Sequence, residues 1–438
     1  MSKILLKDII SYKKGNAFKS TDYQKDGVAI VRVSDFENDT INLNNLYYVS
    51  KEVADKNKNV ILNKYDVVVT TVGASAGNFI RVPEMAEGYL LNQNAVRLRI
   101  NSDEKFEKIY LFYALKYKKF TQYLLAGAQG SAQPSIVLDQ ILNAEIPYPK
   151  KDRRKYISEV LFTLDEKIEL NTQINQTLEQ IAQTIFKSWF IDFDPVHAKA
   201  NALANGQTAE QATQAAMAVI SGKNTQELHR LQTANPEQYQ QLWEIAEAFP
   251  SGFDEEGVPR GWEMTTFGNV SQCFDKKRIP LSKRQREQRA GSIPYYGATS
   301  VMDYVDEAIF DDIYLLIGED GSVLKEDGSP FIQYIWGKAW VNNHAHVLQG
   351  KGSVSTEQLM LFMASTNITA YVTGAVQMKL NQANMNSIPF VKATDRVNEL
   401  FFDLIKDLYA KIRSNTDENR FLVKIRDELL PKLLSGKV

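Results

Sequence analysis

Two stretches decide the fold, Leu164-Asp-Glu-Lys-Ile168-Glu-Leu-Asn171-Thr-Gln-Ile-Asn175-Gln-Thr-Leu178 and Leu408-Tyr-Ala-Lys-Ile412-Arg-Ser-Asn415-Thr-Asp-Glu-Asn419-Arg-Phe-Leu422. Advancing the first stretch by 244 positions places its numbered residues, Leu164, Ile168, Asn171, Asn175 and Leu178, on identical residues of the second. The shared positions alternate steps of four and three, the 3.5-residue spacing of a coiled-coil seam. The sequence therefore predicts two long, similar helices and an internal repeat.

The two predicted helices share a seam with asparagines inside it. The seam positions are Leu164, Ile168, Asn171, Asn175 and Leu178, and Leu408, Ile412, Asn415, Asn419 and Leu422. A buried asparagine destabilises a seam unless an amide partner satisfies it, and its best-attested use is to fix register and orientation. If the helices pair antiparallel, the four amides meet near the middle. The alternative is that each helix packs on its own globule. The apolar spacing slips near Ile181 and Ile425, which predicts that the packing loosens or changes partner there.

The repeat extends, more loosely, beyond the helices. Asp66–Gly73 parallels Asp312–Gly318 as a short apolar run that ends at a glycine, which is typical of a buried strand entering a turn. The predicted class is α+β, with two mixed α/β domains separated by a long antiparallel two-helix coiled coil and related by a pseudo-two-fold repeat. The predicted segments are globules at 1–150 and 262–394, helices at 151–192 and 395–438, and an Ala/Gln-rich insert and linker at 193–261, in which we expect two short helices broken at Gly222 and Pro236.

Composition describes an ordinary globular chain. Its 438 residues are 44% hydrophobic and 24% charged, which allows two or three cores. The single Cys273 excludes a disulfide framework and a cysteine-based zinc site. No secretory signal and no apolar run of about 20 residues is present, so we expect a soluble, cytoplasmic protein without a membrane partner.

Basic residues gather where each half begins, although the net charge is −2. Met1–Lys25 holds six lysines, and Asp275–Gly291 holds seven lysines and arginines. One such patch is commonly just a solvated surface. Two at corresponding places favour a pseudo-symmetric, polyanionic partner, and double-stranded DNA is the obvious candidate.

Two further motifs identify a family. Lys187-Ser-Trp-Phe-Ile-Asp-Phe-Asp-Pro195 closes the first helix, and Pro259-Arg-Gly-Trp262 opens the second globule. With the repeat, they make the chain resemble, over essentially its whole length, the specificity subunit of a type I restriction-modification system. The resemblance implies that each globule is a target recognition domain reading half of a bipartite, asymmetric DNA sequence, and that the helices set the spacer. It also implies partners: two modification (methyltransferase) subunits and restriction (endonuclease/translocase) subunits, which would hold S-adenosylmethionine, ATP and Mg.

Catalytic motifs do not emerge from the sequence. Asn235-Pro-Glu237 lacks the second proline of an amino-methyltransferase loop, and Gly350-Lys-Gly-Ser353 does not fit a phosphate-binding loop. Asp165-Glu-Lys167 lies on the repeated helix and is interpreted as a solvated face. His344 and His346 could share a strand face, but nothing completes a metal site, so we interpret them as core or turn histidines. We expect a non-catalytic chain without a cofactor or metal of its own.

Base readout needs side-chain donors and acceptors on loops of a rigid scaffold. The candidates in the first globule are Lys13, Lys14, Asn16, Lys19, Ser75, Asn78, Gln129 and Gln133. In the second globule they are Lys276, Lys277, Arg278, Arg284, Arg286, Tyr295, Tyr296, Ser322 and Gln377. The competing interpretation is structural, since glycine turns and loop amides commonly serve the fold and Tyr295-Tyr296-Gly297 could be a strand end.

Two other functions remain open at this point. The chain could be the recognition module of a fused or stand-alone restriction or methylation system. It could also be a coiled-coil scaffold that binds only protein. Salt separates the scaffold from the DNA-binding hypotheses, because binding that depends on phosphate contacts weakens steeply as salt is raised.

Overall fold

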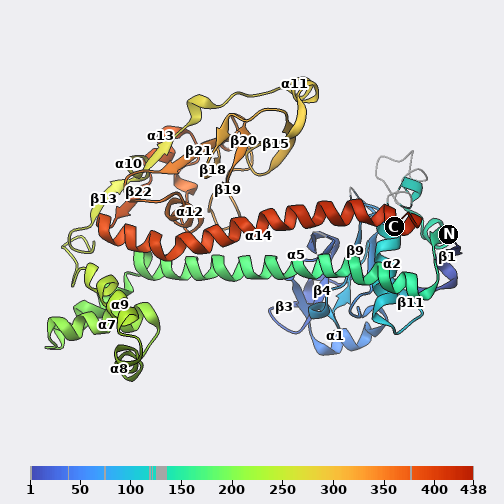
Figure 1. Cartoon of the computed structure of the whole chain (residues 1–438), viewed down its shortest axis with the longest axis horizontal. Coiled ribbons are helices and arrows are strands. Elements are labelled where there is room, and N and C mark those ends of the chain that lie inside the picture. Colours follow the sequence, from blue (N-terminus) through green and yellow to red (C-terminus); the bar gives the residue numbers. More distant parts are fainter. Residues whose placement is uncertain are drawn as a thin grey trace. The chain divides into compact units, whose positions relative to one another are not determined.

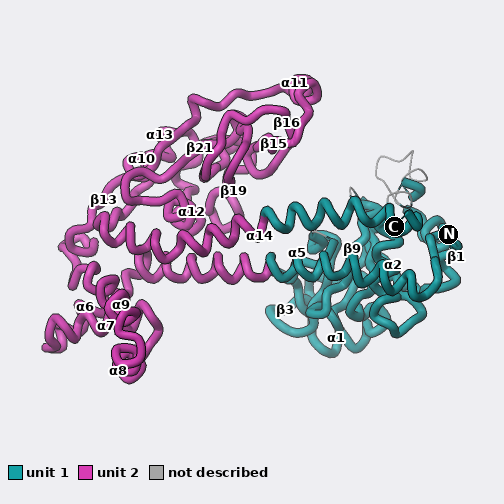
Figure 2. The backbone as a smooth tube through the Cα atoms, in the orientation of Figure 1, with its two compact units in different colours: residues 1–171, 417–438 teal, residues 172–416 magenta. Residues whose placement is uncertain are grey.

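The computed structural model describes residues 2–37, 39–73, 75–117, 120, 122–124, 136–374 and 377–437. These residues form two compact units, Met1–Asn171 with Asp417–Val438 (unit 1) and Thr172–Thr416 (unit 2), shown in two colours in Figure 2. Two long helices, α5 (Lys151–Phe186) and α14 (Asp395–Ser435), each contribute residues to both units.

Unit 1 contains twelve strands and three shorter helices among the described residues (Figure 1). The strands are β1 (Lys3–Leu5), β2 (Ile10–Lys14), β3 (Tyr23–Gln24), β4 (Val28–Val31), β5 (Phe36–Glu37), β6 (Thr40–Ile41), β7 (Tyr47–Val49), β8 (Val67–Thr70), β9 (Phe79–Arg81), β10 (Leu90–Leu91), β11 (Ala95–Ile100) and β12 (Glu145–Pro147). The helices are α1 (Lys51–Lys56), α2 (Lys105–Lys116) and α4 (Leu138–Leu142).

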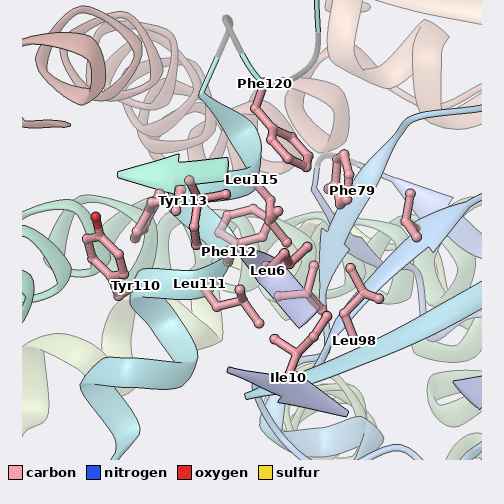
Figure 3. Packing of buried hydrophobic residues seen from close by; sticks show 14 of the residues in the cluster. Leu6, Ile10, Phe79, Leu98, Tyr110, Leu111, Phe112, Tyr113, Leu115 and Phe120 are labelled. Atoms are coloured by element: carbon pink, nitrogen blue, oxygen red, sulfur yellow. The ribbon is translucent and has the colours of Figure 1, made fainter. Parts of the chain in front are cut away.

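The central sheet of unit 1 is buried on both faces. Its order is β2-β11-β8-β9, and helix α2 packs on one face, where Phe112 and Leu111 meet Leu98 and Ile10 (Figure 3). Strand β8 alternates between two cores, because Val67 and Val69 join the α2 side while Val68 joins the side of the sheet β10-β4-β7-β3. Burial on both faces is the reason why the sequence of β8 is continuously apolar.

Unit 2 repeats this plan. Its strands are β13 (Glu263–Thr266), β14 (Ser271–Cys273), β15 (Ala290–Tyr296), β16 (Val301–Val305), β17 (Phe310–Asp311), β18 (Tyr314–Gly318), β19 (Ile332–Ile335), β20 (Lys338–Val341), β21 (Ala345–Gly350) and β22 (Pro389–Lys392). Its shorter helices are α6 (Asp194–Ala204), α7 (Ala209–Ser221), α8 (Thr225–Ala234), α9 (Pro236–Ala248), α10 (Phe267–Val270), α11 (Lys283–Gln288), α12 (Thr356–Ala364) and α13 (Gln382–Asn386).

The central sheets of the two units have the same topology. The order β14-β21-β18-β19 in unit 2 matches β2-β11-β8-β9 in unit 1, and both are antiparallel throughout. Strand β18 also alternates between cores, with Leu315 and Ile317 on one face and Leu316 on the other. The predicted α+β class and internal repeat are confirmed.

The insert between the globules forms four helices, α6 to α9, rather than the two expected. The predicted breaks at Gly222 and Pro236 are correct: Gly222 adopts φ +66° after α7, and Pro236 is the first residue of α9. The further break, between α6 and α7, has a readable signal, because Thr208 and Gln211 form a capping box at the start of α7.

Helices α5 and α14 run antiparallel in each unit. In unit 1, Arg153 reaches the carbonyl of Leu433 while Asn171 reaches Asn419, so residue numbers fall on α14 as they rise on α5. In unit 2, Asn175 contacts Asn415, and Phe186, further along α5, packs on Phe401. The prediction that the two helices pair is therefore correct. Each helix also packs on a globule, α5 through Ile157 in unit 1 and α14 through Tyr409 in unit 2.

Candidate nucleic-acid interface

The amide layer between the helices is the same in both units. Asn171 Nδ2 donates to Asn419 Oδ1 at 3.0 Å in unit 1, and Asn415 Nδ2 donates to Asn175 Oδ1 at 2.9 Å in unit 2. The second amide of each pair donates to a helix carbonyl, Asn419 to Ile168 at 3.3 Å and Asn175 to Ile412 at 3.3 Å. Advancing by 244 positions converts one pattern into the other. The four amides therefore meet in two pairs across the seam, as the sequence predicts. Asn171 Nδ2 also donates to Glu418 Oε2 at 2.8 Å, and Asn415 Oδ1 has no partner among the described residues.

The seam continues through the point where slippage was expected. Ala182 is buried in the seam of unit 2, four residues after Leu178, while Ile181 is 43% exposed. In the first helix the prediction of loosened packing is wrong, because the alternation of threes and fours passes through a small residue that an apolar count overlooks. In the second helix the position four residues after Leu422 is Arg426, which pairs with Asp165 at 3.0 Å, so the packing changes partner there. Exposed Ile181 lies outside the seam.

In unit 1, one edge of the central sheet gathers polar side chains. Strands β2 and β8 both pair antiparallel with β11, Lys14 opposite Val96 and Thr70 opposite Ala95, so both end at the same edge. Lys13, Lys14 and Lys19 are exposed at or near this edge, and Ser75 is exposed in the turn that follows β8. Asn78 is half-buried in that turn, and Asn16 is held by Asn57 at 2.6 Å.

The matching edge of unit 2 gathers the second set. Strands β14 and β18 end there beside β21, with Cys273 opposite Leu348 and Gly318 opposite Ala345. Lys276 and Lys277 follow β14, and Ser322 follows β18. The segment that carries Gln377 returns to this edge, because Leu380 N–H donates to Glu319 O at 2.8 Å and Gly321 N–H donates to Met378 O at 3.1 Å. Ser322 and Gln377 are both exposed.

The predicted cations divide into free and internally bound groups. Among the described residues, no ion pair is made by the exposed side chains of Lys13, Lys14, Lys19, Lys276, Lys277 and Arg284. A cation without a protein partner can release counterions from a phosphate backbone at little internal cost. These six residues therefore remain candidates for phosphate contacts.

Arg278 and Arg286 are corrected from contact candidates to structural residues. The Arg278 side chain is 12% exposed and binds Asp275 and Glu319, and Arg286 is 14% exposed and binds Asp303 at 2.9 Å and the carbonyl of Leu281 at 2.7 Å. Basic residues in a cluster look alike in sequence, but they differ in whether the fold brings a carboxylate within reach of the side chain, as it does for Arg278 and Arg286.

Tyr295 and Tyr296, which the sequence offered as candidates for DNA contact, are buried. Both close strand β15, where they are 1% and 7% exposed and belong to apolar clusters. The Tyr295 hydroxyl accepts the N–H of Leu281 at 2.9 Å. Their structural interpretation, a strand end, is the correct one. Two other candidates for DNA contact, Gln129 and Gln133, lie outside the described residues.

Exposed aromatic residues near the basic segments were missed. Tyr12, on β2 beside Lys13, is 49% exposed, and Tyr304, on β16, is 53% exposed. The signal for Tyr12 was present in the sequence, because the polar run Ser11-Tyr-Lys-Lys14 indicates an edge strand with an outward aromatic residue.

Comparison with known proteins decides the family. Residues 1–180 and 259–419 match the model of the type I restriction modification DNA specificity domain. The chain belongs to the type I specificity family. It is 30% identical to the HindI specificity subunit of Haemophilus influenzae over 403 residues, 86% of this chain and 87% of that protein. The MjaIX specificity subunit of Methanocaldococcus jannaschii is 24% identical over 350 residues, 75% of this chain and 68% of that protein.

A solved structure agrees with this fold. The S subunit of a type I restriction-modification system from M. genitalium has a TM-score of 0.50 at 16% identity, covering 99% of this chain and 95% of that one. Membership in the type I specificity family establishes DNA sequence specificity, in a non-catalytic chain of a methylation and restriction complex, over the scaffold hypothesis. Residues 181–258, which include most of the insert, lie outside the family match. Among the described residues, no helix is both long and apolar enough to cross a membrane.

Proposed function

We propose that this type I specificity chain reads a bipartite, asymmetric DNA target, one half-site with each globule. The observation that carries the proposal is the pair of topologically equal sheet edges, each with free lysines, that differ in their loops. The lysines at the first edge lie on strand β2, Lys13 and Lys14, whereas those at the second edge, Lys276 and Lys277, follow strand β14. Loops that differ in sequence, on sheets of the same topology, support two half-sites of different sequence.

Contacts to phosphates and to bases would fall to different residues. The free lysines and Arg284 suit phosphates, which accept a charge with loose placement. Asn16, Asn78 and Gln377 carry amides that can pair with adenine, and Gln129 and Gln133 remain proposals of the same kind. Ser75 and Ser322 are short hydroxyl donors that suit either role.

Helices α5 and α14 would set the unspecified spacer between the half-sites. Helix α5 has 36 residues, which at about 1.5 Å per residue corresponds to roughly 54 Å. One turn of duplex DNA measures about 34–36 Å, so this length suits half-sites about one and a half turns apart. The repeated amide pairs support a fixed register, which a ruler requires.

The first experiment is a methylome of cells that express this chain with its modification subunit. We expect one bipartite motif with unlike halves. A continuous motif, or site-specific methylation without this chain, would contradict the proposal, and the second outcome would favour a stand-alone system.

A second experiment tests the ruler. A matched four-residue insertion in both helices, on the same side of the amide layer, adds about 6 Å. We expect the spacer to lengthen while both half-sites stay unchanged. The matched control, Lys276→Gln with Lys277→Gln, should weaken binding and lower its salt dependence without changing the spacer. Changed half-sites with the original spacer would refute the ruler.

Apolar side chains on the outer surface of the helices support recruitment of the modification subunits. Leu170 is 50% exposed and Phe421 is 63% exposed, each one or two residues from the Asn171–Asn419 pair of unit 1. Exposed apolar residues of this size on a rigid element suit a protein interface. We expect Leu170→Ser with Phe421→Ser to reduce capture of the modification subunit, whereas Met85→Ser, a 68% exposed residue of the globule, leaves it unchanged. Equal capture by both variants would exclude this surface.

A further inference from the structure

The edge of the central sheet in unit 2 is tied together by buried charges. We call Asp275, Arg278, Glu319, His346 and Lys379 the edge cluster. Four of its side chains are 1% to 15% exposed, and only Lys379 is half exposed. They come from four separate segments: the turn after β14, the turn after β18, strand β21 and the segment that follows Gln377. Charges this deeply buried destabilise a fold unless they are paired.

His346 lies at the centre of the edge cluster with both ring nitrogens occupied. Nδ1 is 2.6 Å from Asp275 Oδ2, and Nε2 is 2.8 Å from the carbonyl oxygen of Leu380. A carbonyl oxygen can only accept, so Nε2 carries a proton. Burial by itself would raise the pKa of Asp275, but the hydrogen bond and charge of His346, the N–H of Val347 and Arg278 together hold that pKa below its usual value. The pair is therefore an imidazolium donating at both nitrogens, one to a carboxylate.

Arg278 and Lys379 extend these links. Arg278 binds Asp275 at 3.1 Å, Glu319 at 2.8 Å and the carbonyl of Ala345 at 2.7 Å, and Lys379 binds Glu319 at 3.3 Å. The segments held in this way are the ones that carry Lys276, Lys277, Ser322 and Gln377. The edge cluster thus fixes the second globule's DNA candidates relative to one another.

Unit 1 builds the same edge with an apolar residue in place of the buried histidine. Continuing the strand register places Asp275 opposite His346, where unit 1 has Lys14 opposite Val96. The neighbouring backbone bonds correspond as well: Thr71 N–H to Asn94 O at 3.0 Å and Ile136 N–H to Thr71 O at 3.0 Å match Glu319 N–H to His344 O and Leu380 N–H to Glu319 O, both 2.8 Å. Val96 is 2% exposed in an apolar core. The buried histidine–carboxylate pair of unit 2 is therefore replaced in unit 1 by an exposed lysine opposite a buried valine.

A metal site does not explain the edge cluster. The ligand atoms of Cys273, Asp275 and His346 lie within 4.8 Å of one another. Burial, however, raises the pKa of the Cys273 thiol to about 12, so it stays protonated. Neither nitrogen of His346 has a lone pair free.

We propose that His346 is a positioning residue for the second half-site: its imidazolium joins the lysine-bearing turn after β14 to the segment of Gln377, and base discrimination by the second globule depends on this link. The proposal rests on the proposed function. The groups that face His346 are Asp275, Arg278, Glu319 at 3.9 Å and Cys273, and Lys379 reaches it only through Glu319.

The test uses the complete chain assembled with its modification subunit and a DNA library randomised over the target. Sequencing of methylated products gives the preference at each half-site separately. Absence of any bipartite motif with the wild-type chain would sink the proposed function, and the positioning role with it. Given that motif, His346→Val, which copies Val96 of unit 1, should lower discrimination at one half-site by about tenfold or more, within the range of a lost base contact. The other half-site should stay unchanged.

Two further variants control for folding and for simple loss of charge. His344 pairs with Asp320 at the same 2.6 Å but its side chain is 47% exposed, so His344→Gln should change discrimination less than about twofold. Asp275→Asn can accept the N–H of Val347 and donate to neutral His346. This variant should keep discrimination.

Discrimination is read as the ratio between the half-sites, which cancels effects on the methylation reaction. The proposal is overturned if the two half-sites relax equally in His346→Val, if neither relaxes in a folded complex, or if His344→Gln matches His346→Val.

Discussion

At the amide layer the two units use the same side chains, whereas one to two turns further along each helix they use different chemistry. In unit 1, Asp165 accepts from Arg426 at 3.0 Å, Arg81 at 3.2 Å and the hydroxyl of Tyr113 at 2.6 Å. The positions related by the repeat in unit 2 are Tyr409, which is 2% exposed, and Ala182, which is fully buried. The comparison teaches that the repeat preserves the contacts that set helix register. The layers that meet each globule have changed with the globule.

The largest expected effect comes from the buried charges of unit 1. Asp165→Ala leaves Arg81 and Arg426 without their shared carboxylate, and we expect a loss of about 3–5 kcal/mol. All five tryptophans, Trp189, Trp243, Trp262, Trp336 and Trp340, lie in unit 2. Denaturation followed by circular dichroism should therefore shift more than denaturation followed by tryptophan fluorescence. Asp427, which is 59% exposed and also pairs with Arg426, provides the control. An equal loss in Asp427→Ala would break the comparison.

The insert of unit 2 has no counterpart in unit 1, and one lysine joins its first helix to its last. Lys199, 5% exposed, donates to the carbonyls of Ala246 at 3.2 Å, Glu247 at 3.3 Å and Phe249 at 2.6 Å, where α9 ends. Lys199→Met leaves these acceptors unsatisfied, so we expect a local loss of about 2–3 kcal/mol. Limited proteolysis should show earlier cleavage between α6 and α9 with no change in unit 1. Unchanged cleavage would mean that the carbonyls find other donors.

The amide layer should respond equally on its two sides. Asn171→Ala and Asn415→Ala each remove the donor of one pair, and each should reduce the free energy of unfolding by about 1–2 kcal/mol. If the two losses of unfolding free energy differ by more than about 1 kcal/mol, the two amide pairs share a geometry but do not contribute equally to stability.

The smallest expected effect is a loss of stability of unit 2 in acid, caused by protonation of Asp275, which we expect to exceed the loss in unit 1. The folded-state pKa of Asp275 lies below its ordinary value. Its stabilisation is therefore fully present above about pH 3.9 and is lost as pH falls through the lower folded pKa. The Asp275→Asn variant should show a flatter acid dependence of its tryptophan-monitored transition. A parallel dependence in both proteins would assign the acid sensitivity to other carboxyl groups.

Sequence reasoning predicted the repeated elements because they follow backbone and packing rules. The heptad spacing and the matched asparagines predicted the antiparallel pair, and the apolar run of β8 indicated a buried strand. It failed where the outcome depends on contacts between distant segments. Arg278 and Arg286 look like Lys276 in sequence, and only the acidic loops folded beside them bind their charge. The same reason hid the edge cluster, whose members are up to about a hundred residues apart.

The lysines of strand β2 have a consequence for solubility. Strand β2 is an outer strand of its sheet and carries the exposed charges of Lys13 and Lys14, whereas its counterpart β14 has only three residues. Long, uncharged edges invite pairing with other chains and hence aggregation. Variants that test DNA contact by removing both lysines should therefore carry glutamine rather than valine or isoleucine, because a β-branched edge would precipitate the protein before its loss of DNA affinity could be measured.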